Sequence, residues 1–273
     1  MTDAPTAPAG VDAPWELFYW ARLEADGKNH MIGRGEFVRL MFEVAGVPYI
    51  DHGVVSARER LLRTNASKVV ATSEERNVVA NFCWGEGNGA GFPVFAPPAI
   101  RKGSFVLSQT PSIMKYLGKE FGLYPTTRED EAHADSLLNT LTDCICEGRL
   151  VFHSKAFCQS YYDQVEEVKP TVAWFEAERL GDFMWYFDQT LRYNAENAKH
   201  TDGFFIGNTL TYVDIAAFHV IEASASQFPV GYSKLETLYP ALAAFRTRIA
   251  SLPNLAAYLA SDRRGLFEGN SMM

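Results

Sequence analysis

Apolar residues recur with two different periods along this chain, and the change between them divides it into two parts. Residues 15–21 form a short aromatic and apolar run, which is typical of a buried strand. Residues 36–44 place Phe37 and Leu40 on one side with helical spacing. The further elements expected in this part are a strand at 47–52, extra helix within 58–82, a hairpin across 99–107 that turns near Gly103, and a helix at 110–121.

Beyond residue 129 the strand patterns stop and only helical spacing remains. A strand-and-helix module followed by an all-helical module predicts an α+β protein with two domains. The first residues are rich in proline, alanine and threonine and have neither a basic start nor an apolar stretch, so we expect a disordered tail and not a signal peptide. The predicted units are a tail at 1–14 and domains at 15–125 and 129–262, with helices at 129–149, 171–198, 213–225, 240–251 and 253–260.

Charge and cysteine content narrow the class of protein. The formal net charge of -8 disfavours a general role on nucleic acid, where a basic surface is expected. No apolar run approaches the roughly 18 residues that a membrane span needs. The four cysteines fit no disulfide framework, so we expect a reducing, cytoplasmic setting.

Three widely separated segments resemble the cytosolic glutathione transferases. The first joins Tyr19 to the sequence GRGEFVRL at residues 33–40, and it is similar to the tyrosine-type (Pi, Mu and Sigma) branches of that family. The second carries Gln109 and Thr110 and resembles the family's glutamine-serine turn with the helix after it. The third, residues 205–214, is similar to the family's capping box in the helical domain.

This resemblance implies both a fold and an activity. The fold is a thioredoxin-like amino-terminal domain followed by an all-helical domain. The activity is that of a glutathione transferase, with glutathione as co-substrate and an electrophilic, apolar small molecule as its partner in the reaction. The family also implies a homodimer, with no metal at the site.

Tyr19 lies where the family places the phenol that faces the glutathione thiol. An ordinary thiol has a pKa of about 8.5, so little thiolate is present at neutral pH. A neutral phenol that donates a hydrogen bond favours the charged sulfur and lowers that pKa. The alternative is one more core aromatic beside Phe18 and Trp20, but strand alternation turns Tyr19 away from both neighbours and favours the functional reading.

The remaining glutathione contacts are also implied by the resemblance. A helix amino terminus attracts a carboxylate, so Thr110, with Gln109 before it, is expected at the γ-glutamyl end, although a plain helix cap is the alternative. Either of two adjacent prolines is the expected cis-proline. The residues assigned to glutathione binding are Gln109, Thr110, Pro97 as the favoured cis-proline, Ala96 before it, Arg34 near the glycyl end or the thiolate, and Trp84 near the glycyl carboxylate.

Thr211 and Asp214 are assigned to folding. Thr-x-x-Asp is a capping box in which an acid satisfies N–H groups at a helix start. Loss of Asp214 is therefore expected to lower the free energy of unfolding by about 1 to 2 kcal/mol and to leave the catalytic chemistry unchanged.

Two segments depart from the family pattern. The stretch between Tyr19 and Arg34 is longer than in the family, and residues 22–30 within it are polar. The stretch at 51–91 is longer as well, and it covers the region from which other glycyl contacts come. The first borders the predicted thiolate site, so it is expected either to rearrange the electrophile pocket or to displace Tyr19.

Three other functions fit parts of the sequence. A metal or redox site is one, although the Cys144-x-Cys146 spacing is not a usual zinc pattern and buried helix residues explain it better. A non-catalytic binding protein on the same fold is another. Peroxide reduction, isomerisation or ether cleavage would use the same thiolate. The remaining residues in these readings are His153 and Cys158 for the metal site, and Tyr161, Trp174 and Phe175 for an apolar substrate pocket.

Overall fold

The computed structural model describes residues 13–64, 78–157, 159–197 and 203–267. Most of the predicted tail, residues 1–12, lies outside this part of the chain. A mixed sheet of four strands forms the amino-terminal half, in the order β2-β1-β3-β4. Strand β1 pairs in parallel with β2 and antiparallel with β3, which pairs antiparallel with β4. The strands are β1 (Trp15–Phe18), β2 (Tyr49–Asp51), β3 (Ala99–Lys102) and β4 (Phe105–Ser108).

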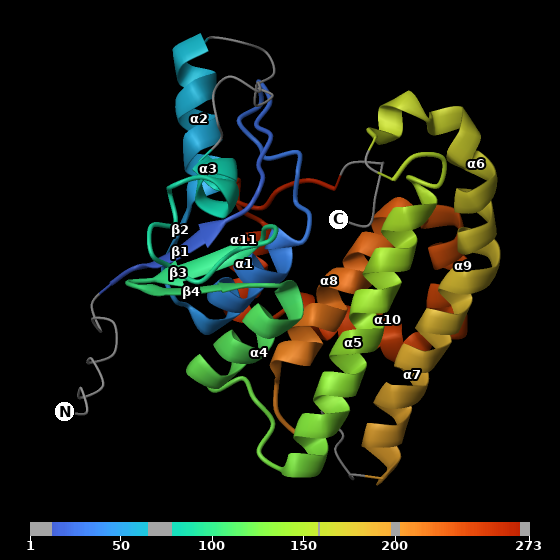
Figure 1. Cartoon of the computed structure of the whole chain (residues 1–273). Helices are drawn as coiled ribbons and strands as arrows, with labels where there is room; N and C mark the ends of the chain where they lie inside the picture. Colours follow the sequence, from blue (N-terminus) through green and yellow to red (C-terminus); the bar gives the residue numbers. More distant parts are fainter. Residues whose placement is uncertain (1–12, 65–77, 158, 198–202, 268–273) are drawn as a thin grey trace.

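The two faces of this sheet are covered by different helices (Figure 1). Side chains alternate across a strand, so Leu17 belongs to the main core while Phe18 belongs to a smaller core on the other face. In the smaller core Phe18 stacks on Phe82 with ring centroids 3.6 Å apart. Helices α1 (Gly35–Ala45) and α4 (Thr110–Glu120) cover the main-core face, and α2 (His52–Thr64) and α3 (Val78–Trp84) lie on the other.

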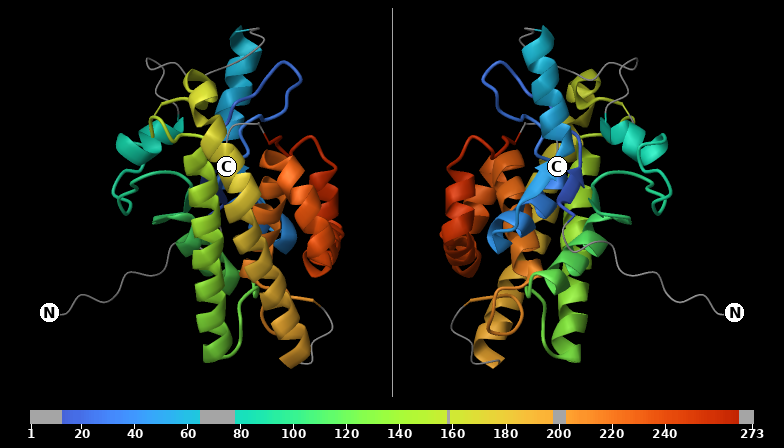
Figure 2. Two further views of the ribbon diagram at one scale, coloured as in Figure 1. Left: turned by 90° about the vertical axis from the view of Figure 1, so that its right-hand side faces the viewer. Right: turned by 90° about the vertical axis from the view of Figure 1, so that its left-hand side faces the viewer.

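From residue 128 the described chain is helical (Figure 2). Helix α8 is buried on almost every side, and its contacts with α1, α4 and α5 join the two halves through one continuous core. The elements are α5 (Arg128–Val151), a 3₁₀ turn (Tyr161–Asp163), α6 (Val165–Trp174), a π-helical turn (Phe175–Arg179), α7 (Leu180–Asn197), α8 (Tyr212–Gln227), α9 (Pro229–Leu238), α10 (Pro240–Ala250) and α11 (Pro253–Leu259).

Several predicted elements agree with the structure to within a few residues, and others need correction. The hairpin turns at Gly103 as expected, and helix α1 ends at Gly46, whose φ of 66° is readily adopted by glycine. The predicted helix at 171–198 begins earlier, at Val165, and runs through Pro170. A helix beginning at Pro229 was not predicted at all.

The predicted capping box at the start of α8 is confirmed. The carboxylate of Asp214 accepts hydrogen bonds from the backbone N–H and the hydroxyl of Thr211, each at 2.8 Å. It also accepts one from the backbone N–H of Phe205, at 2.8 Å. This carboxylate therefore ties the preceding loop to the central helix, which is more than a cap alone does. In the part of the chain that the structure describes, no helix is both long and apolar enough to cross a membrane.

Candidate functional site

The register of the sheet brings the predicted site segments to one end of it. Phe18 of β1 pairs with Ala99 of β3, which in turn pairs with Ser108 of β4. The residues just beyond this row are therefore neighbours, although they come from three distant parts of the sequence. They are Tyr19 after β1, Pro98 before β3 and Gln109 after β4.

Two glycines hold the ring of Tyr19. A Cβ atom at Gly33 would come within 2.3 Å of the Tyr19 hydroxyl oxygen, and one at Gly35 within 2.6 Å of the ring. No side chain fits at either distance, so only glycine allows this close approach. Gly33 also has a φ of 48°, which L-residues with side chains rarely adopt. The GRG sequence thus fixes where the phenol lies.

The Tyr19 hydroxyl accepts a hydrogen bond from the backbone N–H of Arg34 at 2.9 Å. Burial raises the pKa of Tyr19, since only 5% of the residue is exposed and the charged form is disfavoured there. The phenol is therefore neutral at physiological pH. Because its oxygen accepts from Arg34, its own O–H remains available as a donor.

Arg34 links the start of α1 to the helical half. Its guanidinium donates from Nη2 to the sulfur of Cys146 on α5, at 3.1 Å. Cys146 is partly buried, whereas Cys144 is fully buried and burial raises the pKa of its thiol. The two cysteines therefore have different surroundings, which their spacing alone did not reveal. No local signal in the sequence could have found the contact between Arg34 and Cys146.

The helix start after β4 has an unusual backbone. Gln109 adopts a φ of 75° although it is not glycine, and residues held in such conformations often mark functional sites. Its side chain makes no capping hydrogen bond. The next residue, Thr110, is 7% exposed, and its buried hydroxyl has no partner among the residues described. An unsatisfied hydroxyl at a helix amino terminus is a suitable place for a polar ligand group.

The cis peptide bond joins Pro97 to Pro98, which corrects the assignment favoured from the sequence. The cis-proline is Pro98, and the residue before it is Pro97 and not Ala96. The sequence could not separate the two candidates, because both bonds precede a proline and share its weak preference for trans. Pro98 is buried, while Ala96 and Pro97 are partly exposed.

Trp84 also lies at this end of the sheet, but its polar group is already used. The indole N–H donates to the backbone carbonyl of Phe95 at 2.8 Å, and the ring lies 5.8 Å from that of Trp20. Because an indole has a single donor, Trp84 offers no further hydrogen bond to a carboxylate in this arrangement. Its exposed fraction is 60%, so its ring faces solvent beside the predicted site.

Comparisons with known proteins show which proteins this chain is similar to. A family model described as "Glutathione S-transferase, C-terminal domain" matches residues 152–262. The chain is 23% identical over 235 residues to a glutathione S-transferase of Plasmodium falciparum, covering 86% of this chain and 94% of the relative. It is 28% identical over 228 residues to glutathione S-transferase 4 of Caenorhabditis elegans, covering 84% and 91%. The solved glutathione S-transferase of Ascaris lumbricoides superposes with a TM-score of 0.58 at 20% identity, covering 92% of this chain and 98% of the other.

The chain has the glutathione transferase fold. The family model and the relatives support its membership of the glutathione transferase superfamily, and the predicted fold class is confirmed. The Pi, Mu and Sigma-like subclass stays a prediction.

The other sites considered from the sequence have different outcomes in the structure. In the described ranges no group of three or more histidine, cysteine or acidic residues could hold a metal ion, and Cys158 lies outside those ranges. Phe175, expected to line a substrate pocket, is fully buried against Phe228 and belongs to the core. Trp174 beside it is 55% exposed, so only one of this pair faces outward.

Proposed function

We propose that this protein is a glutathione transferase that binds glutathione beyond the Phe18–Ala99–Ser108 row of the sheet. The thiolate of the bound glutathione would then attack an electrophilic, apolar small molecule. The observation that carries the proposal is the convergence of Tyr19, the Pro97–Pro98 bond and the Gln109–Thr110 helix start at one end of the sheet. In this assignment Tyr19 donates its free O–H to the sulfur and Thr110 binds the γ-glutamyl end.

Arg34 and Trp84 have supporting roles in the proposed site. Arg34 would present its positive charge near the thiolate, because its backbone N–H already lies against the Tyr19 hydroxyl. Its Nε is buried without a partner in the described part of the chain, so it can donate a further hydrogen bond. Trp84 would contribute its exposed ring only. Pro97 precedes the cis-proline and, because it has no N–H, would offer only its carbonyl to the cysteinyl unit, while Ala96 before it would add backbone groups of its own.

Replacement of Thr110 with alanine tests the glutathione site without disturbing the fold. The buried hydroxyl has no described partner, so its removal should leave the melting temperature unchanged. A hydrogen bond to a charged ligand group contributes roughly 1.5 to 3 kcal/mol, so glutathione affinity should fall about tenfold or more. Isothermal titration calorimetry measures the loss. Thr110→Ser keeps the hydroxyl and is the matched control, while equal affinity for the alanine variant would remove Thr110 from the site.

We also infer that the protein is a homodimer. Phe92 and Phe95, in the loop before the cis bond, are 74% and 85% exposed, and large apolar side chains exposed together are typical of interaction surfaces. Light scattering over a range of concentrations should give twice the chain mass of 30.5 kDa for the wild type. Phe95→Asp should shift the distribution toward the monomer. A monomeric wild type at all concentrations would refute the inference.

A further inference from the structure

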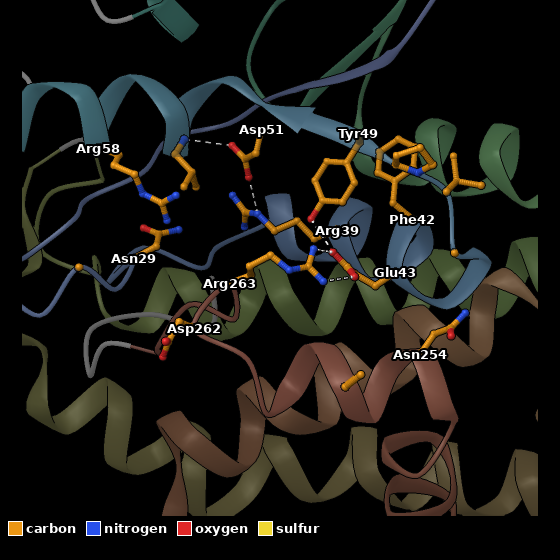
Figure 3. A pocket seen from close by; sticks show the side chains of 16 residues that line it. Asn29, Arg39, Phe42, Glu43, Tyr49, Asp51, Arg58, Asn254, Asp262 and Arg263 are labelled. Carbon is orange, nitrogen blue, oxygen red and sulfur yellow. Dashed lines mark hydrogen bonds and ion pairs between the residues drawn. The ribbon is translucent and has the colours of Figure 1, made fainter.

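A separate cavity lies on the β2 side of the amino-terminal half (Figure 3). Its volume is about 560 Å³, enough for a small organic molecule, and its walls come from α1, β2 and α2 on one side and from α11 with the chain after it on the other. Neither Tyr19 nor Thr110 lines it. The charged side chains in its wall are Arg39, Glu43, Asp51, Arg58, Asp262 and Arg263.

The buried guanidinium of Arg39 has an unused donor in this wall. Arg39 is 3% exposed; its Nε donates to Asp51 at 2.7 Å, and its Nη1 donates to the carbonyl of Ile32 at 2.9 Å and to Glu36 at 3.3 Å. Burial acts to lower the pKa of Arg39, but Asp51 and Glu36 outweigh it and raise the pKa, so the group stays charged. Its Nη2 is buried and has no hydrogen-bond partner in the described residues. Such donors normally have a partner, and here a ligand can supply it.

Arg58 supplies a second cation on the same cavity. Its side chain extends from α2, and Figure 3 draws its guanidinium beside Asn29, with that of Arg39 to one side. No described residue forms an ion pair with it. None of the three acids in the wall pairs with it, because Asp51 is paired with Arg39 and Glu43 with Arg263, and Asp262 lies 3.9 Å from Lys28. The positive charge of Arg58 is therefore not compensated by an acidic side chain, although the protein as a whole has a net charge of -8. Two guanidinium groups on one cavity suit an oxyanion.

Part of the cavity lining is apolar. It consists of Val47, Pro48 and Tyr49 together with Ala257 of α11. A ligand with an anionic head between Arg39 and Arg58 would place its remaining atoms against these side chains. An inorganic ion would leave this part of the cavity unfilled, so the lining favours an organic anion with a small apolar body.

Both segments that depart from the family pattern contribute to this cavity. Gly27 and Asn29 come from the long stretch between Tyr19 and Arg34, which turns back on itself through a bridge between Leu23 and Asn29. Val54 and Arg58 come from the long stretch at 51–91. The structure thus places residues of both segments on the Arg39 cavity.

We propose that this cavity is a second ligand site, for a small organic anion whose phosphate or carboxylate accepts hydrogen bonds from Arg39 Nη2 and Arg58. The site is distinct from the glutathione site at the end of the sheet. Its ligand would occupy the protein together with glutathione.

Phenyl phosphate is a suitable probe, with affinity measured by calorimetry on the full chain in saturating glutathione. Arg58→Ala should weaken binding about tenfold or more, since it removes a charge-assisted contact. Arg58 is exposed on α2, so the variant should fold normally. Arg128→Ala removes an exposed arginine from α5 and is the matched control, with unchanged affinity expected.

A second variant tests the cavity by filling it. Ala257→Phe places a large side chain at an exposed position in the wall and should abolish binding while glutathione affinity stays unchanged. Benzoate is the corresponding probe with a carboxylate in place of the phosphate. It should bind less tightly to both variants than to the wild type. Equal phenyl phosphate affinity in Arg58→Ala and wild type, displacement of the probe by glutathione, or no measurable binding would each overturn the proposal.

Discussion

Replacing Tyr19 with phenylalanine is expected to lower kcat for conjugation of glutathione to a generic aryl halide by roughly 10- to 30-fold at pH 7. The reason is that the Tyr19 O–H is the donor proposed to stabilise the thiolate, and a thiol whose pKa returns to about 8.5 is only about 3% ionised at pH 7. The substitution removes a single oxygen atom from a ring held between Gly33 and Gly35, so the ring itself should stay in place.

The pH profile separates this role from a structural one. Without the donor, the pKa of bound glutathione should rise toward the ordinary thiol value of about 8.5, so the rate of the Tyr19→Phe variant should recover at higher pH. A merely structural tyrosine would lower the rate at every pH equally. Thiolate absorbance in the ultraviolet, recorded against pH for the bound complex, reports the same shift directly.

Tyr116→Phe is the matched control for this experiment. Tyr116 packs against Trp15 and Phe105, at the opposite end of the sheet from the Phe18–Ala99–Ser108 row. Its loss should leave both rate and pH profile unchanged. A wild-type rate that is insensitive to Tyr19→Phe would mean that another group stabilises the thiolate, and the guanidinium of Arg34 would then be the first residue to test.

Replacing Asp214 with alanine is expected to lower the free energy of unfolding by about 3 kcal/mol. The substitution leaves three donors without an acceptor in a fully buried place, namely the N–H groups of Phe205 and Thr211 and the Thr211 hydroxyl. Each unsatisfied buried donor costs roughly 1 to 3 kcal/mol, with partial relief as the loop relaxes. Urea unfolding measures the change. Asp182→Ala, an exposed acid in the first turn of α7, should cost less than about 0.5 kcal/mol.

The same carboxylate should make stability depend on pH. Burial raises the pKa of Asp214 to about 6 in the folded protein, against an ordinary value of about 4. The folded state therefore binds this proton more tightly than the unfolded state does. The resulting stabilisation is fully present below about pH 4 and is lost as pH rises through about 6. The stability of the wild type relative to Asp214→Asn should fall over that window and then level off; a constant difference would contradict the raised pKa.

The sequence by itself determined the features of this protein that depend on neighbouring residues. The hairpin around Gly103, the end of α1 at Gly46 and the capping box of Asp214 follow from turn, cap and periodicity rules that act over a few positions. The order of these elements and the resemblance to the glutathione transferases were enough to predict the fold. The predicted glutathione residues could also be named, because their motifs are local.

The start of α6 shows where a local rule gave the wrong boundary. Proline usually begins a helix, so the sequence favoured a start after Pro170, but packing of Val168 in the core extends the helix back to Val165. Phe175 illustrates the same limit. The sequence does not show whether an aromatic residue on a helix lines a pocket or is buried in the core, and Phe175 is buried in the core.

Only the tertiary structure decided the contacts between distant segments. The hydrogen bond between Arg34 and Cys146 joins residues 112 positions apart. Which of the two adjacent prolines is cis was likewise known only from the structure. The cavity at Arg39 brings together both unusual segments and the carboxyl-terminal chain. Which side chains pair with each other in this cavity, and that Arg39 has a donor without a partner there, depends on how helices and strands pack in space. Periodicity along the chain carries no information about that packing.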